Sequence, residues 1–110
     1  MYKLCRINLE HSKEIINRIK ELVSEMKIKF PVREVYLYGS FAKNEIHEGS
    51  DIDLLIIGDF KERFFERIGK ILELTDLPIE PIVYTPEEFD ELKKSQNPFI
   101  TEVLKTAIKL

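Results

Sequence analysis

The sequence predicts a small α/β domain in which helices flank a mixed sheet of three or four strands. Two short runs of β-branched and aromatic residues, Val35 to Tyr38 and Ile52 to Ile57, are joined by a polar segment short enough to connect neighbouring strands. A third such run, Ile79 to Tyr84, follows a stretch whose apolar residues have helical spacing. Because 110 residues leave room for one core, we expect a single domain over residues 1–110.

The composition is that of a globular chain with a heavily charged surface. Hydrophobic residues make up 44% of the sequence and charged residues 34%, and the net charge is -3. That balance argues against direct nucleic-acid binding, which usually needs a basic surface. Cys5 is the only cysteine, so no intramolecular disulfide can form, and no apolar run is long enough to cross a bilayer. We therefore expect a cytoplasmic protein without a membrane partner.

The first element is predicted to be a helix that begins at Asn8 or Ser12 and ends near Lys27. Its apolar residues recur every three or four positions and form one face, which consists of Ile15, Ile16, Ile19, Leu22, Val23 and Met26. Phe30 precedes Pro31, and a residue before proline disfavours the helical conformation. The helix must therefore end by that point.

Two strands follow, separated by a polar connection. The first is predicted over Glu34 to Tyr38, and a short helix is expected to begin at Ser40, whose hydroxyl can act as the N-cap. The second strand is predicted over Ile52 to Ile57. These two strands provide the centre of the sheet.

A long helix and a third strand come next. Asp59 is predicted as the N-cap of this helix, with Glu62 in the capping-box position, and the helix is expected to end near Thr75. The third strand is predicted over Ile79 to Tyr84. Since Pro81 has no backbone N–H to donate, this strand is expected at the edge of the sheet.

Two helices are predicted to complete the chain. Thr85 and Pro86 are typical of a helix start, with Glu88 placed to complete a capping box. Asn97 and Pro98 repeat this signal before a last helix. The apolar residues of that last helix are expected to be Phe99, Ile100, Val103, Leu104 and Ile108.

The predicted topology brings three acidic residues to one end of the sheet. If the end of the first strand and the start of the second contact one ligand, these two strands must be antiparallel. A helix of crossover length joins the second and third strands, which implies that they are parallel. Asp51 and Asp53 at the start of the second strand then lie at the same end as Glu80 at the start of the third. The two aspartates also share one face, because side chains alternate along a strand.

This arrangement favours the binding of a metal ion beside an anion. Like charges at the rim of an apolar strand repel each other, and a bound cation would remove that cost. Gly39 and Ser40, directly after a strand, allow close approach of a ligand and offer backbone N–H groups to a phosphate. Lys43 could reach a triphosphate from the same loop. The alternative interpretation is an ordinary Gly-Ser turn and two solvated aspartates; the order of the two motifs, each after or at a strand, favours the ligand site.

These motifs resemble the signature of the nucleotidyltransferase superfamily that includes DNA polymerase β. Gly39 and Ser40 are followed, after ten intervening residues, by Asp51-Ile52-Asp53. The longer segments Tyr38 to Lys43 and Ser50 to Leu55 are similar to those of the smallest branch, the minimal nucleotidyltransferases. The motif covers about a quarter of the chain, and the order of elements extends the resemblance over nearly all of it. The resemblance implies a polymerase β-like nucleotidyltransferase fold.

The resemblance also implies roles for the site residues. Asp51 and Asp53 would bind two Mg²⁺ ions, Glu80 would hold the ion that activates the attacking hydroxyl, and all three would be catalytic. Gly39, Ser40 and Lys43 would bind the nucleotide, which is expected to be ATP. The reaction would be in-line attack on the α-phosphorus, with release of pyrophosphate. This sequence departs from the family pattern in having Lys43 in place of a common arginine, Asn44 in place of a glycine and Glu80 in place of a commoner aspartate.

The acceptor is expected to come from a partner, because the chain shows no separate acceptor-binding domain. Proteins of this branch often occur with a small helical HEPN-type protein as antitoxin and toxin, and members of the branch transfer AMP to a tyrosine of that partner. By resemblance, this chain would be the antitoxin of such a toxin–antitoxin system. A second hypothesis is a binding module that neutralises its partner by occlusion without catalysis. A small-molecule acceptor is a third option, and the sequence leaves a homodimer open.

Overall fold

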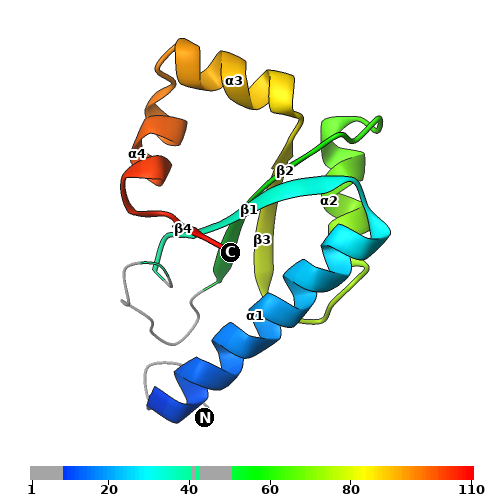
Figure 1. The fold of residues 1–110 in the computed structure, drawn as a ribbon, viewed down its shortest axis with the longest axis vertical. Coiled ribbons are helices and arrows are strands. Elements are labelled where there is room, and N and C mark those ends of the chain that lie inside the picture. Colours follow the sequence, from blue (N-terminus) through cyan, green and yellow to red (C-terminus); the bar gives the residue numbers. More distant parts are fainter. Residues whose placement is uncertain (1–8, 41, 43–50) are drawn as a thin grey trace.

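A four-stranded mixed sheet with four helices around it forms the fold in this computed structural model, which describes residues 9–40, 42 and 51–110 (Figure 1). The strand order is β3-β2-β1-β4. The elements follow in the order α1 (Leu9–Lys29), β1 (Val32–Tyr38), β2 (Ile52–Gly58), α2 (Phe64–Leu72), β3 (Ile79–Tyr84), α3 (Pro86–Lys94), α4 (Pro98–Thr106) and β4 (Ile108–Lys109). This architecture confirms the predicted fold class.

The strand directions agree with the directions predicted from the connections. β1 and β2 are antiparallel, and β2 and β3 are parallel with α2 as the crossover. β3 forms one edge of the sheet, as its Pro81 predicts, and β4 pairs antiparallel with the other side of β1. The pairing therefore places the end of β1 beside the starts of β2 and β3.

Helices cover both faces of the sheet. In β2, Leu54 and Ile56 pack on the side of α1 and α2, whereas Leu55 and Ile57 pack on the side of α3 and α4. The four side chains are buried, since β2 is the central strand between two helical layers. In Figure 1, α3 and α4 lie at the opposite end of the view from α1. The sheet thus divides the core into two apolar clusters.

The predicted start of α2 is wrong by four residues, since the N-cap is Arg63 and not Asp59. Asp59 is not an N-cap, because its Oδ2 accepts a hydrogen bond from Nε of Arg33 at 2.6 Å. The helix begins at Phe64, and the carboxylate of Glu66 accepts a 3.4 Å hydrogen bond from the backbone N–H of Arg63, the N-cap. A contact with β1 therefore prevailed over the local capping pattern.

The C-terminal end of α4 also differs from the prediction. Ile108 was expected in the helix, but α4 ends at Thr106 and Ile108 belongs to β4. Ile108 lies opposite Leu37, and the N–H of Leu110 donates to the carbonyl of Val35 at 2.8 Å. Backbone pairing with the free side of β1 satisfies groups that a longer helix would have left at an open sheet edge.

The starts of α3 and α4 confirm the predicted signals. Thr85 Oγ1 accepts from the N–H of Glu88 at 3.2 Å, and Glu88 Oε1 accepts from the N–H of Thr85 at 2.8 Å. Asn97 Oδ1 accepts from the N–H groups of Phe99 and Ile100. Each signal depends only on residues within one helical turn, so the sequence alone is sufficient to predict where these helices begin.

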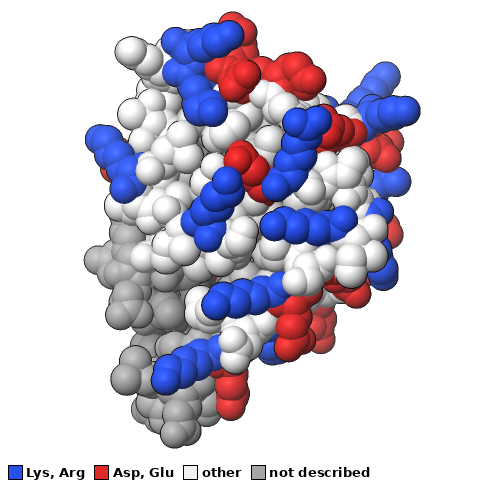
Figure 2. Space-filling view, viewed as in Figure 1, with Lys and Arg blue, Asp and Glu red and all other residues white. Residues whose placement is uncertain are grey.

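Charged groups of both signs lie side by side on the face shown in Figure 2. Several form exposed ion pairs, among them Lys109 with Glu34 at 3.0 Å and Lys70 with Glu62 at 3.0 Å. Within the described ranges, no helix is both long enough and apolar enough to span a membrane.

Candidate active site

Three side chains form a row across adjacent strands at one end of the sheet. Tyr38 of β1 lies opposite Asp53 of β2, and Asp53 lies opposite Glu80 of β3. Directly opposed residues of paired strands point to the same face. Asp51 precedes Asp53 by two positions, so the alternation along β2 directs it to that face as well. The structure thus brings together the three acids that the sequence predicted.

Backbone pairing and burial on the other face hold this end of the sheet in place. The N–H of Ile52, between the two aspartates, donates to the carbonyl of Pro78 at 2.8 Å and so fixes the start of β2 against the start of β3. The side chain of Ile52 is buried against α1 and α2. Since Ile52 points into the core, its neighbours Asp51 and Asp53 must point to the opposite face.

Interactions among the carboxylates raise the pKa of two of them, Glu80 and Asp53. A hydrogen bond to Asp51, together with repulsion by its charge, raises the pKa of Glu80 above its ordinary value of 4.5, and Asp53 adds to this effect. Desolvation by burial raises the pKa of Asp53 above 3.8, aided by the charge of Asp51 and opposed by a hydrogen bond from Glu80. The row therefore holds negative charge at an energetic cost.

The carboxylates at this end of the sheet are a ligand type that a divalent cation such as Mg²⁺ binds. Carboxylate oxygens are the ligands that this ion prefers, and mutual repulsion of the acids is what a divalent cation would relieve. Among the residues that the structure describes, no three acidic, histidine or cysteine side chains are grouped closely enough to hold one ion. Asp51 and Asp53 both raise the pKa of Glu80, so the three carboxylates lie near one another without forming a closed ligand set.

Position 39 requires glycine because of its backbone conformation and because Asp53 occupies the space where a side chain would lie. The φ of 72° at Gly39 lies in the left-handed region that other residues rarely adopt. A Cβ placed on Gly39 would lie 3.2 Å from Cγ of Asp53 and would overlap its Oδ2. The phosphate-binding residue predicted from the sequence is thus in contact with the acidic row.

The other two predicted nucleotide-binding residues are placed differently. Ser40 follows Gly39 in the same turn and is half-buried, in keeping with a position beside the acids. Lys43 lies outside the described residues, as does most of the short helix expected after Ser40. Their part in the site stays a prediction.

Tyr38 was not predicted as a site residue, although it occupies the row beside Asp53. Desolvation by burial, with the charges of Asp53 and Glu80, raises the pKa of Tyr38 to about 12. Its ring meets that of Phe99 edge to face, with 5.8 Å between the ring centroids. The only local sign of a role for Tyr38 was its position directly before Gly39. Aromatic residues are common in apolar strands, so this position did not mark it as a site residue.

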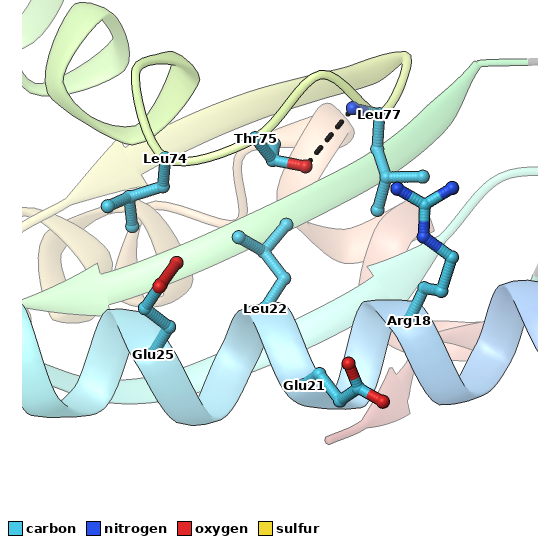
Figure 3. Close-up of a pocket in the computed structure, with 7 residues that line it drawn as sticks. All are labelled: Arg18, Glu21, Leu22, Glu25, Leu74, Thr75 and Leu77. Carbon is cyan, nitrogen blue, oxygen red and sulfur yellow. Dashed lines mark hydrogen bonds between the residues drawn. The ribbon is translucent and has the colours of Figure 1, made fainter.

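A hollow extends from this row toward α4. It is lined by Tyr38, Gly39, Phe99, Glu102, Val103 and Thr106. Another hollow lies between α1 and the connection from α2 to β3, where Leu22 faces Leu74 and Leu77 (Figure 3). That second hollow contains none of the predicted site residues, whereas the first is lined by Tyr38 and Gly39, which lie beside Asp53.

Comparison with known families and proteins gives a consistent result. The profile of the family described as "Nucleotidyltransferase domain" matches residues 19–108. A Methanocaldococcus jannaschii protein assigned to the protein adenylyltransferases is 44% identical over 92 residues, which cover 79% of this chain and 89% of that protein. The protein adenylyltransferase MntA of Thermococcus cleftensis is 34% identical over 66% of this chain and 67% of its own length.

A solved structure shares the fold. The crystal structure of a Sulfolobus solfataricus protein assigned as a nucleotidyltransferase superposes with a TM-score of 0.63 at 28% sequence identity. The superposition covers 76% of this chain and 78% of that one.

Proposed function

Because the chain belongs to the nucleotidyltransferase domain family, in its minimal branch, we propose that it transfers AMP from ATP to a hydroxyl group of a protein partner. The observation that carries the proposal is the row in which Asp53 lies opposite Glu80 and against Gly39. A phosphate-accepting turn beside paired carboxylates is the arrangement that a nucleoside triphosphate with a divalent cation requires.

The turn after β1 would bind the triphosphate. Gly39 has no Cβ, so phosphate oxygens can approach its backbone, and Ser40 adds a hydroxyl and an N–H group. Lys43 would add a positive charge from the same segment. These groups hold the β- and γ-phosphates and leave the α-phosphorus toward the acidic row.

Asp51, Asp53 and Glu80 would hold Mg²⁺, with two ions expected. The bound ions would polarise the phosphate oxygens and neutralise the charge that develops as pyrophosphate leaves. The acids would position the ions, and the pairing of β2 with β3 fixes Asp53 opposite Glu80. The positions of these acids would be the main contribution of the fold to catalysis.

The reaction is an in-line displacement at phosphorus. The acceptor oxygen forms a bond to the α-phosphorus while the bond from that phosphorus to the α,β-bridging oxygen breaks. Pyrophosphate leaves with that electron pair, and the hydroxyl proton passes to a carboxylate of the row, of which Glu80 is exposed at the rim. No covalent enzyme intermediate is needed.

The acceptor we propose is a tyrosine of a HEPN-type helical partner, with this chain as the antitoxin. The names of the relatives support a protein as the target. The partner itself follows from the family resemblance set out above. Modification of a toxin tyrosine would add a bulky, charged group and so neutralise it.

The test uses the full chain, ATP labelled at the α-phosphate, Mg²⁺ and the product of the adjacent gene. Label on the partner, with release of pyrophosphate, is the expected result. Asp51→Asn and Asp53→Asn should abolish labelling, whereas Asp76→Asn, an exposed aspartate paired with Arg18 far along the chain, should not.

Two results would contradict AMP transfer at the acidic row. Labelling that survives both substitutions would place the chemistry elsewhere. Neutralisation of the partner by both substituted proteins, without label, would instead support the non-catalytic binding module.

A further inference from the structure

We infer that the hollow between Tyr38 and α4 is the subsite for the adenine base of the nucleotide, with Phe99 as the ring on which the base stacks. This inference rests on the proposed function and adds to it the residues that would read the base. It concerns the side of the site that faces α4.

The hollow is continuous with the phosphate turn. Tyr38 and Gly39 line it, and Gly39 is also the residue that contacts Asp53. Tyr38 also lies opposite Asp53, so a nucleoside attached to an α-phosphate at Asp53 would have this hollow one strand away. The hollow shown in Figure 3 lies on the opposite face of the sheet, beneath α1, and has no such continuity.

The lining suits a flat aromatic ring. Phe99 leaves 39% of its surface exposed, although it is a large apolar residue, and its edge-to-face contact with Tyr38 supports the ring in one orientation. Val103, buried in the core below, closes the floor. Stacking of a base on such a ring raises affinity by roughly 5- to 150-fold.

The position of Phe99 is fixed from below. Asn97 Oδ1 accepts the N–H groups of Phe99 and Ile100 at 3.0 and 3.2 Å, and Ile100 is buried against the sheet. The first turn of α4 is therefore anchored, and the ring of Phe99 needs no ordering when a ligand arrives.

Glu102 supplies polarity at the rim. Its side chain is 73% exposed, and its carboxylate contacts Nζ of Lys105 at 3.4 Å, a weak pair that leaves the side chain free to turn. A carboxylate accepts a hydrogen bond from the exocyclic amino group of adenine and repels the carbonyl that hypoxanthine carries at the same position. The rim thus favours adenine over hypoxanthine.

Calorimetric binding of α,β-methylene-ATP, which cannot be cleaved at the reacting bond, tests the subsite in the absence of any acceptor. Phe99→Ala should weaken this binding about tenfold while inorganic triphosphate, which has no base, binds as it does to the wild type. Leu104→Ala is the matched control, since Leu104 is 36% exposed on the same helix and does not line the hollow. It should leave both affinities unchanged.

The role of Glu102 is tested by the ratio of the affinities for ATP and ITP. Glu102→Ala should reduce the preference for ATP over ITP in displacement of the same analogue, whereas Lys105→Ala, which breaks the same ion pair, should not. The ratio cancels any general effect of the removed charge on the triphosphate.

The outcomes separate the two proposals. If the wild type binds the analogue and Phe99→Ala binds it equally well, the subsite is wrong and the proposed function stands. Equal loss of inorganic triphosphate binding in Phe99→Ala would show a general disturbance and also overturn the subsite. If the wild type binds neither ligand, the proposed function and the subsite both fail.

Discussion

Asp53 on β2 lies directly opposite Glu80 on β3, the edge strand, although 27 positions separate them in the sequence. The register of the parallel pairing between the two strands places these two residues side by side. A cross-strand pair of like charges is unfavourable in an ordinary sheet. Its presence at the strand ends, beside a glycine in a left-handed conformation, is what a ligand-binding site would require.

Asp53→Asn is expected to reduce AMP transfer by roughly 100-fold or more, the range seen when a preorganised charged or polar group at a reaction centre is removed. The amide keeps the shape of the side chain but loses the charge that would hold a divalent ion. Initial rates with labelled ATP measure the effect. A loss of less than tenfold would argue against a central role for this residue.

The same substitution should stabilise the protein when no metal is present. At neutral pH the negative charges of Asp51, Asp53 and Glu80 repel one another, so neutralising one should raise the free energy of unfolding by a few tenths to about 1 kcal/mol. Urea denaturation in buffer with a chelator measures this. Addition of Mg²⁺ should then stabilise the wild type and not the variant; stabilisation of both would place the ion elsewhere.

Gly39→Ala should lower the free energy of unfolding by roughly 1–3 kcal/mol, because alanine disfavours a φ of 72° and its Cβ would overlap Asp53. Binding of inorganic triphosphate should fall as well. Gly69→Ala is the control: Gly69 lies within α2, a Cβ there would meet nothing within 4 Å, and the change should stabilise by about 1 kcal/mol. If the two substitutions shift stability in the same direction, the conformational argument is wrong.

Arg67→Ala should destabilise the fold by roughly 2–3 kcal/mol, since it leaves buried groups without partners. Arg67 is 7% exposed and donates to the carbonyls of Glu62 and Val83 and to the carboxylate of Glu88 at 2.8 Å, so it joins α2, β3 and α3. Thermal or urea unfolding measures this. Arg18→Ala, which removes an exposed pair, should change stability by less than about 0.5 kcal/mol.

The ion pair of Arg67 with Glu88 should make stability depend on pH. The hydrogen bond from Arg67 lowers the pKa of Glu88 below its ordinary value of 4.5 in the folded protein. The folded state then binds fewer protons than the unfolded state, so the stabilisation is complete above pH 4.5 and is lost as the pH falls through the lowered pKa. Glu88→Gln should flatten the fall in stability below pH 4.5, and an unchanged profile would contradict the coupling.

Several features of the site could be predicted because their signals are local. Thr85 and Asn97 begin helices through side chains that cap their own first turns. The length of the connection between β2 and β3 decides that they are parallel, and this alone brings Glu80 to the end of the sheet where Asp51 and Asp53 lie.

Other features could not be predicted because they depend on residues far apart in the chain. Asp59 pairs with Arg33 on β1, so α2 begins later than its capping pattern suggests. Ile108 pairs with β1 because that strand has a free side, which no signal near Ile108 reveals. In the sequence, Tyr38 and Phe99 each have the pattern of ordinary core residues. Their contact becomes apparent only when α4 packs against β1.

The sequence alone predicted where the candidate site residues lie, because strand periodicity and connection length place Asp51, Asp53 and Glu80 at the end of the sheet next to Gly39 and Ser40. Only the tertiary structure decided what surrounds them: the contact of Gly39 with Asp53, the place of Tyr38 in the acidic row, and the hollow bounded by Phe99. The physical reason is that periodicity and capping act within a few residues, whereas these contacts arise from packing between elements that the chain separates.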